Sequence, residues 1–333
     1  MDSAIEIMGL IGWLLVGGFV VIRIFFALAR RRKLVLQNRW IVVTGCDSGI
    51  GMGLMKKLIE EQVSVIAFCL TEEGSKAALG AGAKLAPRLD ITDTAAVQNS
   101  CDQVIQICGE RLWGLAHVAG FAQPGFIEFQ NMTNYRRTMD VNFFAITDIT
   151  QRLIPSLKNT EGRVVIVTSV DGIVSLPGNA PYDAAKFAAE AYADALRVEL
   201  SFWNVGVSVI NPSTLRTPLS MSFFDSETVT WEKMEEMDPD GAWKQAWSRA
   251  WLDEFVEENG KRLEAIAQDP AHAVNDIYHA LAAVRPKSRY LSGHLAKTVF
   301  YALWLMPEHW SFLLKKAMVS PTPKVDLPEK RDV

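Results

Sequence analysis

The sequence contains little cysteine and carries no excess of positive charge. Its four cysteines, Cys46, Cys69, Cys101 and Cys108, form no C-x2-C pair of the kind that binds zinc. A chain of 333 residues that is 49% hydrophobic can build its core without a disulfide framework, which favours a reducing, cytosol-like environment. The formal charge of −4 argues against a nucleic-acid partner, which needs a basic surface. We therefore expect neither a metal site nor a nucleic-acid complex.

The N-terminal segment is apolar enough to span a membrane. Residues 7–29 carry one charge, Arg23, in 23 residues, and a helix of that length extends about 34 Å. The basic cluster 30–33 follows directly, so the positive-inside rule places the rest of the chain in the cytosol. A cleaved signal peptide is the alternative, although its basic residues would precede the apolar core. We predict a single-pass anchor with its basic flank over residues 1–36, in the endoplasmic reticulum membrane.

The C-terminal segment over residues 291–320 is apolar in two short pieces, 299–306 and 310–314. Neither piece is long enough to span a bilayer, and lysines and aromatic residues accompany both. We predict a membrane-associated hairpin or cap here, with a buried core helix as the alternative. Residues 321–333 are predicted to be a polar tail.

The middle of the chain lacks repeats and low-complexity blocks, and strands alternate with helices along it. We expect strands at residues 40–44, 63–70, a segment ending at Leu89-Asp90, 114–118, 164–168 and 205–210, and helices at 52–61 and 94–108. This alternation predicts an α/β fold, a Rossmann-type doubly wound parallel sheet over residues 37–290. Ligands of such sheets bind at the carboxyl ends of the strands.

A helical insertion rich in Trp, Met and acidic residues is expected over residues 218–270. We interpret it as a lid over a substrate. A surface subdomain with a small core of its own is the alternative.

A glycine-rich loop follows the first strand and opens the first helix. Gly45 permits a tight turn, and Gly49 and Gly51 let the backbone approach a pyrophosphate at the helix N-terminus. The spacing is T-G-x-x-x-G-x-G rather than the general G-x-G-x-x-G fingerprint, and a purely structural turn is the alternative. The predicted cofactor contacts in this loop are Gly45, Ser48, Gly49, Ile50 and Gly51.

The acidic residues that follow the second and third expected strands indicate which dinucleotide binds. The second strand runs into Glu72 and Glu73, with no Lys or Arg nearby, and an acid here would bind a ribose 2′-hydroxyl and repel a 2′-phosphate. NAD is therefore favoured over NADP, although these acids come slightly late and can simply be a solvated helix start. Asp90, after the third strand, is either a contact to the adenine or a turn residue.

Tyr182 and Lys186 lie four residues apart in an alanine-rich helix, so their side chains share one helix face. A fixed ammonium beside the phenol is expected to lower the pKa of Tyr182 from about 10 to between about 7 and 9. Such a phenol can accept the proton of an alcohol while hydride leaves its carbon. Lys186 can also hold a nicotinamide ribose. The same spacing is common in helices that have no catalytic role.

Ser169 and Asn142 complete a candidate catalytic set. Ser169 ends the fifth expected strand, where its hydroxyl can donate to the reacting oxygen; a strand-end cap is the alternative. Asn142 lies within a helical pattern although Asn is a poor helix former, which indicates either a proton relay through water or a satisfied structural amide.

Together, the glycine loop, Asn142, Ser169 and the Tyr182-x-x-x-Lys186 pair resemble the short-chain dehydrogenase/reductase family over about residues 38–220. The resemblance implies Tyr182 as acid/base, Ser169 orienting the substrate, Lys186 binding ribose and lowering the Tyr182 pKa, and Asn142 completing a relay. It also implies that Pro212 and Thr217 belong to a nicotinamide loop, and a possible homodimer.

Within that family, the chain looks similar to the membrane-anchored retinol and hydroxysteroid dehydrogenases, whose relatives include 3-hydroxybutyrate dehydrogenase. One motif departs from the family pattern: His117-Val118-Ala119-Gly120 stands where the family has Asn-Asn-Ala-Gly. Ala119 and Gly120 still let the backbone pass close to a cofactor. The missing Asn pair removes hydrogen bonds that brace the sheet edge, and His117 either replaces part of them or is simply packed.

The leading hypothesis is an NAD(P)-dependent oxidoreductase that interconverts an alcohol and a carbonyl on a lipophilic substrate of the retinol or hydroxysteroid type. A small hydroxy acid of the 3-hydroxybutyrate type is the alternative, and its carboxylate would need a cation such as Arg216 or Lys244. A membrane-tethered, non-catalytic nucleotide-binding module is a third hypothesis.

Overall fold

The computed structural model describes residues 13, 16–18, 21 and 32–321. The predicted anchor and the predicted polar tail therefore lie almost wholly outside the described residues. Within the described part of the chain, no helix combines the length and the apolar character needed to cross a membrane. Residues 32–36 are attached to the main domain, because the Leu34 amide donates to the Ala282 carbonyl at 2.6 Å and Leu36 is buried.

Six parallel strands form one sheet in the order β2-β1-β3-β4-β5-β6. The strands are β1 (Trp40–Thr44), β2 (Ser64–Phe68), β3 (Leu112–His117), β4 (Arg163–Val167), β5 (Gly206–Pro212) and β6 (Arg289–Ser292). Their apolar, β-branched runs are what the sequence indicated, and the Rossmann-type parallel sheet is confirmed. The order places the β1 and β3 carboxyl ends side by side, which is the switch point where such sheets bind ligands.

One expected strand is wrong and one strand was missed. The segment ending at Leu89-Asp90 makes only isolated bridges, from Leu85 to Ile66 of β2 and from Arg88 to Cys69 just after β2. Pro87 lies between these bridges and has no N–H to continue a ladder. The sixth place in the sheet is taken by β6, a strand too short and too polar to stand out in the sequence.

Helices cover both faces of the sheet, and alternate strand residues face opposite layers. The helices of the domain are α2 (Gly49–Glu60), α3 (Glu72–Gly80), α4 (Thr94–Cys108), α5 (Met132–Met139), α6 (Ala145–Thr160), α7 (Ala180–Ser201) and α11 (Ala271–Ala282). In β1, Ile41 and Val43 belong to the core beneath α2 and α11, whereas Val42 belongs to the core beneath α4, α6 and α7. A π-helical turn, Asp140–Phe144, joins α5 to α6.

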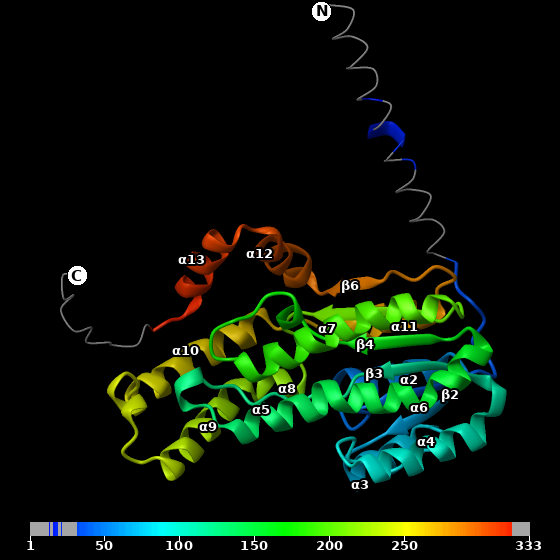
Figure 1. The fold of residues 1–333 in the computed structure, drawn as a ribbon, viewed down its shortest axis with the longest axis horizontal. Coiled ribbons are helices and arrows are strands. Elements are labelled where there is room, and N and C mark those ends of the chain that lie inside the picture. Colours follow the sequence, from blue (N-terminus) through cyan, green and yellow to red (C-terminus); the bar gives the residue numbers. More distant parts are fainter. Residues whose placement is uncertain (1–12, 14–15, 19–20, 22–31, 322–333) are drawn as a thin grey trace, which may run out of the picture.

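The predicted insertion is helical and has its own aromatic core. It comprises α8 (Pro218–Met221), α9 (Phe223–Met237) and α10 (Arg249–Ile266), which extend from one end of the sheet (Figure 1). Trp231, Trp243, Trp251 and Phe255 pack together with Phe129. Phe223, Glu227 and Phe255 also line a cavity against the main domain, and the lid stays a prediction.

After β6, the chain forms α12 (Tyr301–Leu305) and α13 (Glu308–Met318), which rise away from the sheet on the side opposite α3 and α4 (Figure 1). Phe300 and Leu303 pack against Val170 and Val174, so one side of this hairpin is core. Its other side is apolar and exposed, including Trp310 at 61%.

Candidate active site

The glycine loop between β1 and α2 is closed by its own backbone. Gly45 has a φ of +73°, a conformation that favours glycine, and a Cβ at Gly45 would lie 2.7 Å from the Ala119 Cα. A Cβ at Gly51 would overlap the carbonyl oxygen of Gly45. The loop can therefore hold this shape only with glycine at both positions, and it places the N-terminus of α2 at an open groove.

That groove has a volume of about 410 Å³ and runs along the carboxyl ends of β1, β2 and β3. The sequence-predicted cofactor contacts that line it are Gly45, Ser48, Gly49, Ile50, Gly51, Asp90, Ala119, Gly120 and Thr217. Pro212 lines the neighbouring cavity instead. The residues present fit a dinucleotide, since a narrow backbone cradle at a helix N-terminus suits a pyrophosphate.

The acid at the end of β2 comes from the glycine loop. The Asp47 carboxylate accepts hydrogen bonds from the Leu70 amide at 2.8 Å and from the Thr71 amide and hydroxyl at 2.9 and 2.7 Å. Asp47 lines the groove, whereas Glu72 forms an exposed pair with Lys76. Glu72 and Glu73 lie in the first turn of α3, as the alternative of a solvated helix start predicted, and Asp47 was not expected at this place.

Asp90 is a turn residue at the edge of the groove. Its Oδ1 accepts from the Thr92 amide at 2.9 Å and from the Thr92 hydroxyl at 2.8 Å, so it is a turn residue. It also lines the groove.

Thr44 braces the sheet edge where the family's Asn pair is missing. Its hydroxyl accepts hydrogen bonds from the Val118 and Ala119 amides, each at 3.0 Å. His117 points elsewhere: its Nε2 lies 2.8 Å from the Thr150 hydroxyl, and burial lowers the pKa of His117 to about 3. His117 is thus a neutral, packed side chain that ties β3 to α6, and Thr44 supplies the bracing.

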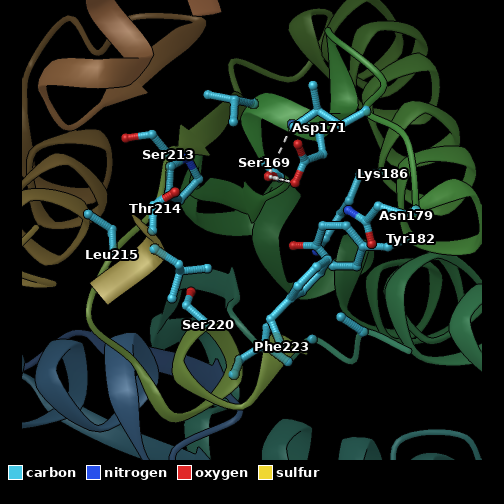
Figure 2. A pocket seen from close by; sticks show the side chains of 18 of the residues that line it. Ser169, Asp171, Asn179, Tyr182, Lys186, Ser213, Thr214, Leu215, Ser220 and Phe223 are labelled. Atoms are coloured by element: carbon cyan, nitrogen blue, oxygen red, sulfur yellow. Dashed lines mark hydrogen bonds between the residues drawn. The ribbon is translucent and has the colours of Figure 1, made fainter. Parts of the chain in front are cut away.

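Tyr182 and Lys186 share one face of α7, as the spacing predicted. The Lys186 ammonium lies 5.3 Å from the centre of the Tyr182 ring and donates to the Val167 carbonyl at 3.1 Å. Burial lowers the pKa of Lys186 to about 8, although the charges of Asp171 and Glu190 oppose this. Figure 2 shows Tyr182, Lys186 and Ser169 around one cavity.

The expected lowering of the Tyr182 pKa is wrong for the protein alone. Burial raises the pKa of Tyr182 above its ordinary value, the charge of Asp171 raises it further, and Ser169 opposes the rise. Desolvation disfavours a phenolate more than the nearby ammonium stabilises it. The phenol is therefore protonated at neutral pH.

Asp171 is a site residue that the sequence did not reveal. The Ser169 hydroxyl donates to the Asp171 Oδ2 at 3.1 Å, and the Asp171 amide donates back to the Ser169 Oγ at 3.1 Å (Figure 2). Burial raises the pKa of Asp171 to about 6. Ser169 is thus a cap of the following turn, as the alternative predicted. Its oxygen is also held in place at the cavity by the Asp171 amide.

Asn142 sits in the π-helical turn, where both the nitrogen and the oxygen of its side-chain amide are hydrogen-bonded. Its Nδ2 donates to the carbonyls of Phe121 and Thr138 at 2.6 and 3.0 Å, and its Oδ1 accepts from the Phe121 amide at 3.2 Å. These contacts match the structural-amide alternative rather than a relay through the side chain. They fix the loop at Gly120, which borders both the groove and the cavity.

The cavity beside Tyr182 has a volume of about 300 Å³ and a mainly apolar wall. Of the Lys and Arg residues that the structure describes, only Lys186 lines it. Arg216 donates to the Glu264 carbonyl, and Lys244 pairs with Glu235 at 2.7 Å, so neither faces the cavity. Among the described residues, the cavity therefore offers no cation besides Lys186 that could bind the carboxylate of a hydroxy acid.

The chain is similar to known proteins over most of its length. A family model described as short chain dehydrogenase matches residues 39–228. Human retinol dehydrogenase 16 is 31% identical over 93% of this chain and 98% of its own. Mouse 17-beta-hydroxysteroid dehydrogenase type 6 is 31% identical over 84% of this chain and 88% of its own.

Two solved structures are similar in fold. A short-chain dehydrogenase/reductase from Burkholderia phymatum in complex with NAD aligns with a TM-score of 0.66, at 19% identity over 88% of this chain and 100% of its own. One from Burkholderia cenocepacia in complex with NADP aligns with a TM-score of 0.60, at 20% identity over 86% of this chain and 100% of its own.

Proposed function

The chain belongs to the short-chain dehydrogenase family and is an NAD(P)-dependent oxidoreductase acting on CH–OH groups; we propose that its substrate is a lipophilic alcohol, or the matching carbonyl compound, of the retinol or hydroxysteroid type. The observation that carries this proposal is the junction of an apolar cavity with the nucleotide groove. Ile50, Gly120 and Thr217 line both spaces, and Tyr182, Ser169 and Lys186 line the cavity.

In the mechanism that we propose, the glycine loop, Asp47, Ala119 and Thr217 hold the dinucleotide, which supplies or accepts a hydride when bound. Tyr182, protonated at neutral pH, donates its proton to the carbonyl oxygen during reduction. Ser169 donates its one hydroxyl proton to the same oxygen once it releases its bond to the Asp171 carboxylate, while the Asp171 amide still holds the Ser169 Oγ in place. In the reverse direction Tyr182 acts as a phenolate, which the nearby Lys186 ammonium stabilises.

We propose NAD rather than NADP as the preferred cofactor. Asp47 supplies a carboxylate at the end of β2, where it suits a ribose 2′-hydroxyl and repels a 2′-phosphate. Arg137 is the one Lys or Arg among the described groove residues, and its guanidinium stacks on the Phe121 ring at 4.5 Å.

Two observations weigh against the other hypotheses. A small hydroxy acid would bring a carboxylate into a cavity that Asp171 and Glu227 line and that has no cation besides Lys186 among its described residues. A non-catalytic module would have no need of Tyr182, Ser169 and Lys186 gathered at one cavity.

An assay that follows the absorbance of reduced nicotinamide tests this function. Full-length protein in phospholipid vesicles is supplied with NAD or NADP and with retinol, a hydroxysteroid or 3-hydroxybutyrate. We expect reduced nicotinamide to form with NAD and a lipophilic alcohol. Turnover of 3-hydroxybutyrate alone would overturn the substrate proposal, and a preference for NADP would overturn the cofactor proposal.

We also propose that the enzyme is held at a membrane, the endoplasmic reticulum membrane in our assignment, by the N-terminal anchor and by the α12–α13 hairpin. The hairpin exposes Trp304, Trp310 and Phe312, while Phe300 and Met318 line the cavity. A bilayer that receives the exposed aromatics would therefore lie beside the cavity, where lipophilic substrates partition. A homodimer stays a prediction.

Removing exposed aromatic side chains of the α12–α13 hairpin should raise KM for a substrate that is dissolved in a membrane. In full-length protein, the double variant Trp310→Ser and Phe312→Ser is expected to raise KM for a vesicle-borne alcohol by roughly tenfold, with KM for NAD unchanged. The control is Phe202→Ser, which removes a 79% exposed aromatic just after α7. Equal KM values for the double variant and the control would rule the hairpin out as the docking element.

A further inference from the structure

Two buried polar side chains in the cavity wall have unpaired atoms. Glu227 on α9 is 1% exposed, and its Oε1 has no hydrogen-bond partner among the described residues. Asn179, at the start of α7, is 4% exposed, and within the same part of the chain its Oδ1 is likewise unpaired. Burial raises the pKa of Glu227 to about 8, and no Lys or Arg in the described part of the chain opposes this, so the carboxyl is protonated at neutral pH.

Both side chains line the same cavity, on chain segments that approach each other. A Cβ at Gly178 would lie 3.8 Å from the Glu227 Oε1, and Asn179 is the next residue along the chain. The Leu176 amide fixes this loop by donating to the Asp183 Oδ2 at 2.7 Å. Figure 2 shows Asn179 beside Tyr182 at the cavity.

The cavity wall near Glu227 and Asn179 includes several apolar side chains. Phe126, Phe224, Phe255 and Leu263 line the same cavity with apolar surface. Burying a polar atom without a partner costs folding free energy, and native proteins keep few such atoms. An apolar side chain of similar size would fill the position of Glu227 without that cost, so a polar group of a ligand is the partner that accounts for it.

We propose that Glu227 and Asn179 bind a second oxygen of the substrate, a hydroxyl or carbonyl group remote from the reacting carbon. This inference rests on the proposed function and narrows it. The enzyme would then favour lipophilic substrates with two oxygen functions, such as hydroxysteroids, over those with one, such as retinol. A neutral carboxyl offers both a donor and an acceptor, and the Asn179 Oδ1 is an acceptor, so a hydroxyl can pair with both side chains.

Binding can be measured without turnover. Trp247 and Trp251 contact Phe126, with ring centres 4.6 and 5.3 Å apart, so ligands in the cavity should quench their fluorescence. We expect full-length protein to bind androstanediol about 10- to 100-fold more tightly than the matched androstanol that lacks the second hydroxyl. Glu227→Met should abolish this preference, and Glu227→Gln should keep most of it. Glu236→Gln, at an exposed position of the same helix, is the control and should change nothing.

Two results would overturn the proposal: a preference for the diol that survives in Glu227→Met, or an amino analogue that binds more tightly than the diol. Thermal melting keeps the test interpretable, because Glu227→Met removes an unpaired buried carboxyl and should melt several degrees higher than the natural protein. Turnover separates the two proposals. If androstanol and androstanediol are oxidised equally well, only the second-oxygen site fails; if no lipophilic alcohol is oxidised, the proposed function fails.

Discussion

Replacing Tyr182 with Phe is expected to lower kcat by about 10³-fold and to leave the affinity for NAD unchanged. The substitution removes the phenolic oxygen that donates or accepts the proton, and general acid–base catalysis typically contributes 10²–10⁴-fold. The ring remains, so its contact with the Lys186 ammonium and the bond from Lys186 to the Val167 carbonyl can persist. Steady-state kinetics and a fluorescence titration with NADH measure the two quantities separately.

Tyr192→Phe is the matched control for that variant. Tyr192 lies on the same helix, is half-buried and packs against Phe143, away from the cavity. The kcat of the Tyr192→Phe variant should equal that of the natural protein. If Tyr182→Phe kept more than about a tenth of the natural kcat, Tyr182 would not be the proton-transfer residue.

Gly51→Ala is expected to weaken NADH binding by at least about tenfold and to destabilise the fold by about 1–3 kcal/mol. The added Cβ overlaps the Gly45 carbonyl oxygen, which belongs to the backbone and cannot turn aside as a side chain can. The loop that lines the groove must therefore shift as a whole. Fluorescence titration with NADH and chemical denaturation measure the two effects.

Gly80→Ala provides the control for Gly51→Ala. It makes the same chemical change at the end of α3, where a Cβ would have no atom within 4 Å. It should leave NADH binding intact and leave stability unchanged or slightly higher, since alanine is the better helix former. Unchanged NADH affinity in Gly51→Ala would contradict the placement of the cofactor at this loop.

The parallel sheet was predictable because its central strands are short runs of β-branched residues that end in turns. Helix α4 has the predicted bounds, Thr94–Cys108, and in the structure the Asp93 side chain caps its first turn. β6 was not found, since a four-residue strand with two polar residues carries little signal. The anchor lies almost wholly outside the described residues and stays a proposal.

The site was predictable where motif and spacing determine geometry. Tyr182 and Lys186 share a helix face because they are one turn apart, and the glycines close the loop because only glycine fits. Asp47 and Glu227 were missed as site residues because their positions depend on contacts between distant parts of the chain, whereas Asp171 was missed although its contact with Ser169 is only two residues away. The prediction for the Tyr182 pKa was wrong because the burial of the phenol and its approach to the Asp171 charge both depend on tertiary structure.

Transfer of isotope from substrate to cofactor tests the central claim most directly. Full-length protein in vesicles is given NAD and a hydroxysteroid with deuterium on its carbinol carbon, and the recovered cofactor is weighed by mass spectrometry. We expect each reduced nicotinamide to carry one deuterium, and Tyr182→Phe to yield almost none. Oxidised steroid accompanied by unlabelled cofactor would contradict direct hydride transfer at this site.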